Sequence, residues 1–453
     1  MNSSSVRYIT LGCKVNQYET QAMRESLSEA GLSAWNGKES NQSVDFVVIN
    51  TCTVTSNADK ENLYWIRRAR REHPGAKIVV TGCMAERNGE QLKAIKDVDL
   101  LISNYHKADI AAYLTESCSS PALQDAEHQR LRKRVYAPLT ISETQGGGRA
   151  FVKIQDGCNH ACSFCKVVLV RGRSRSRDLE AIVDEGKRLR DAGYRELVFA
   201  GIQLGAYGDD LGLDEGLSRV LEACSEIEGI ERLRLSSIEP TDVSPQLIKT
   251  MSQLPKSCSQ MHIPLQSGDD DILHAMNRRY TRSFYRDLVS QLRTSVPGFM
   301  LTLDVMVGFP GETDGQFQNT VDLLESITPL KCHVFPYSRR DGTRAAVLTD
   351  VDNAVLKSRV QSLMVKSDVW SQRVRKPYLN QTVSVLVESC TESGLLQGLT
   401  SNYFKVCFPG PEEWIGAMRD VDLLHLENDL FLGRSVQDRD DSERILSIRS
   451  SER

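Results

Sequence analysis

The N-terminal part of the chain repeats one unit: a short run rich in Val and Ile, followed by a stretch with apolar residues at three-to-four spacing. Such alternation of strands and helices is typical of an open parallel α/β sheet. The expected strands are Val6–Leu11, Asp45–Asn50 and Lys77–Thr81, and the expected helices between them include Tyr18–Ala30 and Lys60–Arg71. We place this α/β domain at residues 1–115.

A cysteine follows each of these three strands within a residue or two: Cys13, Cys52 and Cys83. The carboxyl ends of parallel strands meet at one edge of a sheet, where ligands bind. We therefore expect the three thiols, far apart in the sequence, to converge. The alternative interpretation is three buried cysteines that act as small hydrophobic residues, which would need the same coincidence three times.

A second alternating region spans residues 146–375 and predicts about six strand-helix units, the number for a partial (βα)6 barrel. Its clearest helix is Asp178–Ala192, whose apolar residues share one face. Ligands of such barrels sit at the carboxyl ends of the strands. The expected strands are Ala150–Ile154, Glu196–Ala200, Arg232–Ser236, Met261–Pro264, Leu301–Val307 and His333–Phe335.

Three more cysteines follow the first strand of this region with the spacing Cys158-x3-Cys162-x2-Cys165. Iron–sulfur clusters are normally held by four cysteines, so a triplet on one tight loop predicts a cluster with one iron free to bind a reactant. Two alternatives remain open from spacing alone. The triplet could be accidental, or it could be a zinc site that takes its fourth ligand from a distant residue.

The rest of the chain divides into three further segments. Residues 116–145 read as a linker, and residues 438–453 as a polar tail. Residues 376–437 change to short alternating strands, which predict a small C-terminal β-barrel. The expected strands are Thr382–Glu388, Gly398–Leu399, Phe404–Phe408 and Asp420–Leu426.

The start of the chain has no apolar signal segment, and no apolar run is long enough for a membrane span. We therefore expect a cytoplasmic protein without a membrane partner. In that reducing compartment the 12 cysteines are not expected to form disulfides, and grouped cysteines indicate metal binding or catalysis.

Basic residues are concentrated around the second cysteine triplet, although the whole chain has a formal net charge of −4. Four arginines alternate directly after it, at Arg171, Arg173, Arg175 and Arg177. They are well placed to contact a polyanion beside the site of the chemistry. Equally, they could be an ordinary solvated surface.

Taken together, the motifs resemble the radical S-adenosylmethionine (radical SAM) superfamily and, within it, the methylthiotransferases. The resemblance runs over nearly the whole chain. It is strongest for the branch that acts on N6-threonylcarbamoyladenosine beside the tRNA anticodon. The segments that carry it are Thr-Leu-Gly-Cys-Lys-Val-Asn-Gln-Tyr-Glu (10–19), Asn-Thr-Cys-Thr-Val-Thr (50–55), Thr-Gly-Cys (81–83), Gln-Asp-Gly-Cys (155–158), Arg-Gly-Arg-Ser-Arg-Ser-Arg (171–177), Ser-Ser-Ile-Glu-Pro (236–240), His-Ile-Pro-Leu-Gln-Ser-Gly (262–268), Gly-Phe-Pro-Gly-Glu-Thr (308–313) and His-Val-Phe-Pro-Tyr-Ser (333–338).

The resemblance implies S-adenosyl-L-methionine and two 4Fe-4S clusters as cofactors. Cys158, Cys162 and Cys165 would bind the cluster that cleaves S-adenosylmethionine to a carbon radical, and Cys13, Cys52 and Cys83 a second cluster that carries or delivers sulfur. Further cofactor contacts would come from residues at strand ends and beside the last cysteine: Phe164, Gly201, Ser236, Glu239, Gln266, Gly308 and Gly311.

The implied reaction is addition of a methylthio group to C2 of the modified adenosine. A single-stranded anticodon loop can present such a base, held by phosphate contacts from Arg171, Arg173, Arg175 and Arg177, with the C-terminal barrel resembling a TRAM domain. An electron donor such as flavodoxin or ferredoxin and a sulfur source would be partners. Sister branches act on isopentenyladenosine in tRNA or on a ribosomal-protein aspartate. A different class of protein, an RNA-binding protein with structural metal sites, is the remaining alternative.

Overall fold

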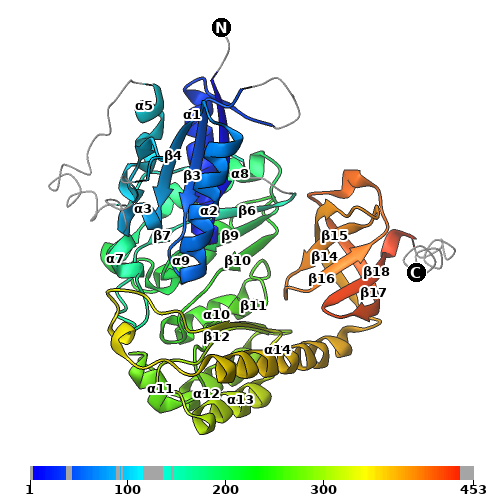
Figure 1. The fold of residues 1–453 in the computed structure, drawn as a ribbon. Coiled ribbons are helices and arrows are strands. Elements are labelled where there is room, and N and C mark those ends of the chain that lie inside the picture. The colour runs from blue at the N-terminus through cyan, green and yellow to red at the C-terminus, as the bar shows by residue number, and fades with distance from the viewer. Residues whose placement is uncertain are drawn as a thin grey trace.

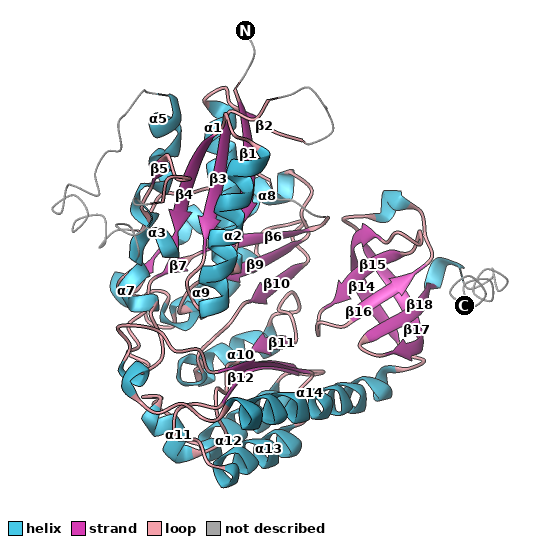
Figure 2. Cartoon of the chain, in the orientation of Figure 1, coloured by secondary structure: helices cyan, strands magenta, loops and turns pink. Residues whose placement is uncertain are grey.

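The computed structural model describes residues 4–36, 43–87, 92, 95–115, 136–143 and 147–438. It contains an N-terminal α/β layer, a central partial barrel and a C-terminal closed β-barrel (Figure 1). The α/β layer stands on one end of the central barrel, and the C-terminal barrel lies beside its β6–β9–β10 side (Figure 2). Most of the predicted linker and nearly all of the predicted tail lie outside the described residues, so those two boundaries stay predictions.

The N-terminal domain is a five-stranded parallel sheet in the order β2-β1-β3-β4-β5. Its strands are β1 (Ser5–Thr10), β2 (Ser33–Ala34), β3 (Phe46–Thr51), β4 (Lys77–Gly82) and β5 (Leu100–Leu101). The register pairs Thr10 with Asn50 and Asn50 with Thr81, so the three long strands end at the same edge, as expected. Its helices are α1 (Lys14–Glu29), α2 (Ser56–Glu72), α3 (Cys83–Arg87), the 3-10 helix η1 (Asn104–Asp109) and α5 (Ile110–Thr115).

Alternating apolar residues bury both faces of this sheet. Val47 and Val80 pack against Ile66 of α2 on one face, while Val48 and Val79 pack with Met23 of α1 on the other. Two buried faces are what a doubly covered parallel sheet requires, and they explain why its strands are nearly continuous runs of Val and Ile.

The central domain has six parallel strands in two sheets, β6-β9-β10 and β11-β12-β13. Isolated bridges, Leu233 with Ser257 and Ser237 with His262, join β10 to β11. The predicted partial (βα)6 barrel is therefore confirmed, with a seam in its middle and two open edges, β6 and β13. The strands are β6 (Arg149–Lys153), β9 (Glu196–Ala200), β10 (Arg232–Leu235), β11 (Gln260–His262), β12 (Met300–Val307) and β13 (Lys331–Pro336).

Helices cover the outside of this barrel (Figure 1). Helix α8 (Leu179–Asp191) matches the predicted helix; the side chain of Asp178 accepts a hydrogen bond from the backbone N–H of Ala181 and caps it. The other helices are α7 (Val167–Arg171), α9 (Gly216–Ser225), α10 (Pro245–Gln253), α11 (Asp270–Ala275), α12 (Arg282–Ser295), α13 (Asp314–Ile327) and α14 (Asn353–Arg375). A short antiparallel hairpin, β7 (Gln155–Asp156) with β8 (Arg175–Ser176), frames the second cysteine loop and was not expected from the sequence.

The C-terminal module is a closed five-stranded barrel in the order β14-β15-β16-β18-β17. Its core contains Val385, Phe404 and Phe431. The predicted strands are present, and a further one, β18, closes the barrel by pairing parallel to β16. The strands are β14 (Thr382–Cys390), β15 (Leu396–Thr400), β16 (Lys405–Phe408), β17 (Met418–Glu427) and β18 (Leu430–Ser435). Among the residues described, no helix has the length and apolarity that crossing a membrane would require.

Candidate active site

The first three cysteines converge at the carboxyl edge of the N-terminal sheet, as the strand pattern predicts. Cys13 is the residue directly before α1, Cys52 follows β3, and Cys83 begins α3. A Cβ built on Gly12 would stand 2.6 Å from the Cβ of Cys52, which shows how closely the β1 and β3 ends approach. Cys52 and Cys83 are buried, and Cys13 is exposed.

Gly82 shows why this edge tolerates little change. Its φ is +98°, and a Cβ at this position would stand 2.3 Å from the carbonyl oxygen of Thr51 on the neighbouring strand. An L side chain is disfavoured at this φ and has no space here. The glycine before Cys83 therefore lets β4 turn sharply against β3 and brings that thiol to the shared edge.

The thiols of this N-terminal triplet influence one another. Burial raises the pKa of Cys52 to about 11, a backbone hydrogen bond from Val54 opposes this, and the charges of Cys83 and Cys13 raise it further. Burial also raises the pKa of Cys83, whereas the positive charge of Arg171 lowers it. These mutual effects are consistent with three thiols grouped at one site.

The second triplet lies on the loop between β7 and α7. Each of its sulfurs accepts a hydrogen bond: Cys158 Sγ from the backbone N–H of His160 at 3.3 Å, Cys165 Sγ from Val167 at 3.4 Å, and Cys162 Sγ from the Arg278 guanidinium at 3.6 Å. Burial raises the pKa of Cys158 to about 12 and that of Cys165 to about 11. Hydrogen bonds of this kind favour the thiolate, which is the form that binds metal.

Each triplet offers three thiols, the donor type that iron–sulfur clusters use. Within the described ranges, no three His, Cys, Asp or Glu side chains are arranged to hold one metal ion. In a cubane cluster each cysteine binds a different iron, so its ligands stand further apart than those of a mononuclear zinc site.

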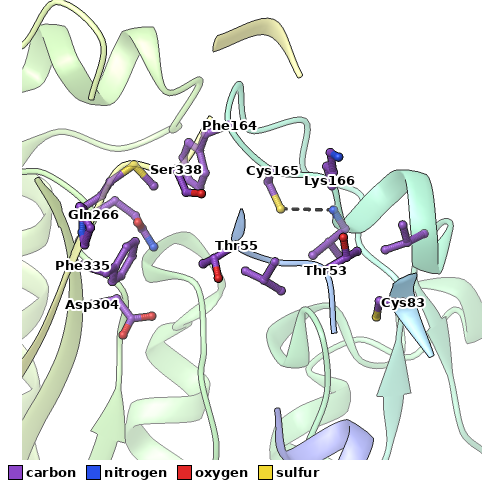
Figure 3. Close-up of a pocket in the computed structure, with 15 residues that line it drawn as sticks. Thr53, Thr55, Cys83, Phe164, Cys165, Lys166, Gln266, Asp304, Phe335 and Ser338 are labelled. Carbon is purple, nitrogen blue, oxygen red and sulfur yellow. Dashed lines mark hydrogen bonds between the residues drawn. The ribbon is translucent and has the colours of Figure 1, made fainter. Parts of the chain in front are cut away.

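One cavity of about 190 Å³ lies between the two triplets. Cys83 of the first triplet and Cys165 of the second both line it. Figure 3 shows Gln266, Phe335 and Asp304 on one side of this cavity and Cys165 and Cys83 toward the other. The remaining lining residues are Thr53, Val54, Thr55, Phe164, Lys166, Val167, Val170, Met306, Pro336 and Ser338.

Gln266 gives a direct sign that the cavity is built for a polar ligand. Its backbone has a φ of +62°, which is unusual for a residue other than glycine. Its side-chain Oε1 is buried without a hydrogen-bond partner among the described residues. A buried acceptor is costly to leave unpaired, so a donor on a bound group would satisfy it. The residues of this cavity therefore fit S-adenosylmethionine, which carries amino donors.

The structure separates the predicted cofactor residues into two groups. Phe164 and Gln266 line the cavity. Glu239 is linked to the cysteine loop indirectly. Its carboxylate pairs at 2.7 Å with Arg278, and Arg278 donates a hydrogen bond to Cys162 Sγ. The others lie outside the lining, at Gly201, Ser236, Gly308 and Gly311. Their contact with the cofactor stays a prediction.

The prediction of RNA contacts from four arginines needs correction. Arg171, Arg175 and Arg177 are 1%, 4% and 4% exposed, so their guanidiniums are closed off from a bound polyanion. They form ion pairs instead: Arg171 with Glu19, Arg175 with Asp156 and Arg177 with Glu185. Arg173 is exposed, and for this residue the phosphate contact stays a prediction.

The partner of Arg171 was not found by sequence reasoning. The carboxylate of Glu19, on α1, accepts hydrogen bonds from Arg171 at 2.6 Å, Lys153 at 2.7 Å and Lys107. Burial alone would raise the pKa of Glu19, but the three cations hold it well below its usual range. Arg171 also donates through Nε to Cys83 Sγ at 3.3 Å, so this network connects Cys83 with α7, the helix that follows the second cysteine loop.

Polar side chains continue from the cavity into the barrel interior. His262 contacts Asp304 at 3.3 Å and the Thr302 hydroxyl at 3.1 Å, and its ring lies 5.6 Å from that of His333 on β13. Burial lowers the pKa of His333, and the positive charge of Lys14 is among the further causes. Lys14, the residue after Cys13, lies with its ammonium 5.8 Å from the ring centre of Phe151 on β6. Burial lowers its own pKa to about 8, and the positive charges of Arg149 and Arg234 contribute.

Comparison with known proteins defines the class first. A family model described as "Radical SAM superfamily" matches residues 152–324, and one described as "Uncharacterized protein family UPF0004" matches residues 5–103. The structure of the radical S-adenosylmethionine methyltransferase TsrM from Kitasatospora setae, with cobalamin and a 4Fe-4S cluster bound, is similar with a TM-score of 0.56 at 14% identity. The match covers 77% of each chain. This last likeness concerns the fold alone.

Relatives narrow the class to a family. The threonylcarbamoyladenosine tRNA methylthiotransferase MtaB of Bacillus subtilis is 37% identical, over 93% of this chain and 94% of the relative. The MtaB of Thermotoga maritima is 34% identical, over 90% and 92%. The tRNA-2-methylthio-N(6)-dimethylallyladenosine synthase of Moorella thermoacetica is 32% identical, over 95% and 98%. The chain belongs to the radical SAM methylthiotransferase family, and is therefore a transferase that uses a 4Fe-4S cluster and S-adenosylmethionine.

Proposed function

We propose that this enzyme adds a methylthio group to C2 of N6-threonylcarbamoyladenosine next to the tRNA anticodon, giving the 2-methylthio derivative. The observation that carries the proposal is the cavity shared by Cys83 and Cys165, because it brings one member of each triplet to the same space. Relatives named as threonylcarbamoyladenosine methylthiotransferases support the choice of substrate.

Each triplet has its own role in this proposal. Cys158, Cys162 and Cys165 would hold the cluster that, with S-adenosylmethionine, supplies a carbon radical able to attack an unreactive C–H bond. Cys13, Cys52 and Cys83 would hold a second 4Fe-4S cluster and present sulfur to the same cavity. Because the family match does not itself establish the second cluster, its presence is part of the proposal.

The surrounding side chains place the reactants and exclude water. Phe164, Met306 and Phe335 give the cavity apolar walls, which shield a reactive intermediate from solvent. Gln266 offers an unpaired acceptor, and Asp304 offers a carboxylate beside it. These two polar groups orient a bound molecule, while the apolar walls supply most of the contact area.

The remaining partners are also proposed. The anticodon loop of tRNA would reach the barrel opening with Arg173 as one phosphate contact, and the closed C-terminal barrel would act as a TRAM-like RNA-binding module. The reaction needs an electron donor such as flavodoxin or ferredoxin and a source of sulfur. Its expected place is the cytoplasm, where tRNA is modified.

The direct test uses anaerobically reconstituted enzyme, S-adenosylmethionine, a reductant and sulfide with an anticodon stem-loop carrying threonylcarbamoyladenosine. Mass spectrometry of the digested RNA should show the 2-methylthio nucleoside. Replacement of Cys158, Cys162 and Cys165 by Ala should abolish cleavage of S-adenosylmethionine. Replacement of Cys13, Cys52 and Cys83 by Ala should keep that cleavage and abolish sulfur insertion. If the second triple variant still makes the product, the proposed division of roles is wrong.

Dimethylallyladenosine is a second candidate substrate, because relatives named for it are 32–33% identical over most of the chain. A competition assay with equal amounts of the two stem-loops separates the candidates. We expect product from the threonylcarbamoyl stem-loop; preferential product from the dimethylallyl stem-loop would overturn the proposed substrate. A ribosomal-protein aspartate, the third possibility, is tested by the same assay with the protein in place of RNA.

A further inference from the structure

Lys14 is the residue after Cys13, and its side chain extends toward the open side of the barrel. Its ammonium lies 5.8 Å from the ring centre of Phe151 on β6, one open edge of the barrel. Its charge also acts on His333 of β13, the other open edge. Arg234 and Glu196, from β10 and β9, are among the groups whose charges act on Lys14. Lys14 therefore lies against the open β6 edge of the barrel, next to Cys13.

Lys14 differs from the other cations around it because no carboxylate of the described residues lies within ion-pair distance of it. Arg149 pairs with Glu388 at 3.0 Å, Arg234 with Glu196 at 2.6 Å and Lys153 with Glu19 at 2.7 Å. For Lys14, which is half-buried, the structure gives no hydrogen bond and no ion pair among the described residues. A partly desolvated ammonium without a counter-ion favours binding of an anion.

The proposed substrate carries one anionic group besides its phosphates. The threonyl part of threonylcarbamoyl has a free carboxylate, whereas a dimethylallyl group is apolar and uncharged. In adenine, C2 and N6 lie on the same edge of the ring system, with N1 between them. A base that turns C2 toward the cysteine-lined cavity therefore carries its N6 substituent beside that cavity, within the barrel region where Lys14 lies.

We propose that Lys14 binds the carboxylate of the threonylcarbamoyl group and so selects this substrate over adenosines with an uncharged N6 substituent. The inference rests on the proposed function and adds the residue that recognises the substituent. The Lys14 ammonium gains a counter-ion when threonylcarbamoyladenosine binds, because the threonyl carboxylate is negative. When dimethylallyladenosine binds, the ammonium faces an apolar group instead. Such a site discriminates mainly by leaving its charge unpaired with the wrong substrate.

The experiment measures binding of reconstituted enzyme to three stem-loops of one sequence. They carry threonylcarbamoyladenosine, its carboxamide analogue without the negative charge, or dimethylallyladenosine. We expect wild-type enzyme to bind the first about tenfold more tightly than the carboxamide. Lys14→Met should lose this preference while binding the carboxamide as wild-type does, and Lys14→Arg should restore most of it. Lys249→Met, at an exposed position of α10, is the matched control and should keep the preference.

Two results would overturn the inference. In the first, the Lys14→Met variant retains the tenfold preference for the threonylcarbamoyl stem-loop. In the second, it binds the threonylcarbamoyl and the carboxamide stem-loops more weakly than wild-type by the same factor. Iron content and far-UV circular dichroism check that the variant is folded, and Lys14→Gln is a second neutral variant if Met disturbs the site. Methylthiolation by wild-type enzyme is measured separately. If wild-type does not modify the threonylcarbamoyl RNA, the proposed function fails; if it does and the Met variant keeps its preference, only the role of Lys14 fails.

Discussion

The central barrel is joined to its two neighbouring domains by different chemistry. At the N-terminal junction, Glu19 and Lys107 of the α/β domain form buried ion pairs with one another and, through Glu19, with Lys153 and Arg171 of the barrel. At the C-terminal junction the most deeply buried donors are also arginines, but they reach backbone carbonyls, while the ion pairs Arg149–Glu388 and Lys331–Asp429 are partly exposed. Arg232 donates to Leu399 O and Arg234 to Thr400 O and Ser401 O.

This difference matches what each junction has to hold. A buried carboxylate shared by cations of two domains cannot release one of them without leaving a charge unpaired, so this arrangement is rigid and specific in position. The N-terminal junction also contains the hydrogen bond from Arg171 to Cys83 and thus connects Cys83 with α7, the helix that follows the second cysteine loop. The buried carbonyl acceptors at the C-terminal junction demand a backbone shape but no particular side chain, and its ion pairs, Arg149–Glu388 and Lys331–Asp429, are partly exposed. The C-terminal junction attaches the C-terminal barrel, whereas the N-terminal junction also positions residues of the active site.

The largest effect is expected from Glu19→Gln at the N-terminal junction. The neutral side chain leaves Lys107, Lys153 and Arg171 buried without their shared counter-charge. We expect the free energy of unfolding to fall by about 3–5 kcal/mol in urea denaturation. Glu29→Gln, at an exposed position of the same helix, is the control and should change it by less than about 0.5 kcal/mol. Equal values for the two variants would contradict the assigned role of the network.

A smaller, local effect is expected from Arg234→Met at the C-terminal junction. The variant loses hydrogen bonds to two carbonyls and leaves Glu196 with Arg232 at 3.8 Å. We expect a loss of about 2–3 kcal/mol and faster proteolysis near residues 376–381, with iron content unchanged. Arg232→Met is the comparison, since it leaves the Arg234–Glu196 pair intact and should cost less. Loss of iron from Arg234→Met would break the distinction between the two junctions.

The third prediction tests whether the sheet edge at Gly82, and not only the ion pairs of the N-terminal junction, is needed to hold iron. Gly82→Ala places a Cβ against the Thr51 carbonyl, so we expect loss of about half of the bound iron with a destabilisation of about 2 kcal/mol. Gly193→Ala is a matched control, because Gly193 has a similar φ of +95° but no atom within 4 Å of the added Cβ. It should cost about 1 kcal/mol and leave the iron in place. Equal iron in both variants would show that the edge tolerates movement.

The smallest effect is expected from removal of iron by a chelator under anaerobic conditions. Both junctions are made of protein groups, so the far-UV circular dichroism should stay unchanged, and the unfolding temperature should fall by only about 5 °C. Limited proteolysis should give the same pattern with and without iron. A large loss of helical signal would mean that the clusters, and not the junctions, hold the domains together.

The strands and the convergence of cysteines could be predicted from local sequence because both follow from short-range patterns. Runs of Val and Ile mark strands that are buried on both faces, and Cys13, Cys52 and Cys83 follow three of them. The partial barrel and its cysteine loop were predictable for the same reason. The parallel strand β18 was not, because Leu430–Ser435 is short and its partner β16 precedes β17 in the chain.

The arginines show where local pattern fails. Alternating Arg and Ser at positions 171–177 has the composition of an exposed basic surface, yet three of these arginines are buried. For Arg171 the difference comes from Glu19, which lies 152 residues away in the sequence, while Arg175 pairs with Asp156 and Arg177 with Glu185. A buried cation and an exposed one have the same local sequence, and only the tertiary position of the carboxylate distinguishes them. The role of Lys14 could not be predicted from local sequence either, since only the fold shows that no carboxylate of the described residues pairs with it.

The sharp turn at Gly82 has a consequence for how the enzyme is made and maintained. Its backbone geometry is set by pairing of β4 with β3, so the thiol of Cys83 is in place once the sheet has formed. In zinc fingers the metal drives folding, whereas here the sheet edge is formed by protein contacts, so we expect the chain without iron to keep this edge. On that expectation, an enzyme that has lost its clusters to oxygen keeps its fold and can be reconstituted with iron and sulfide, without synthesis of a new chain.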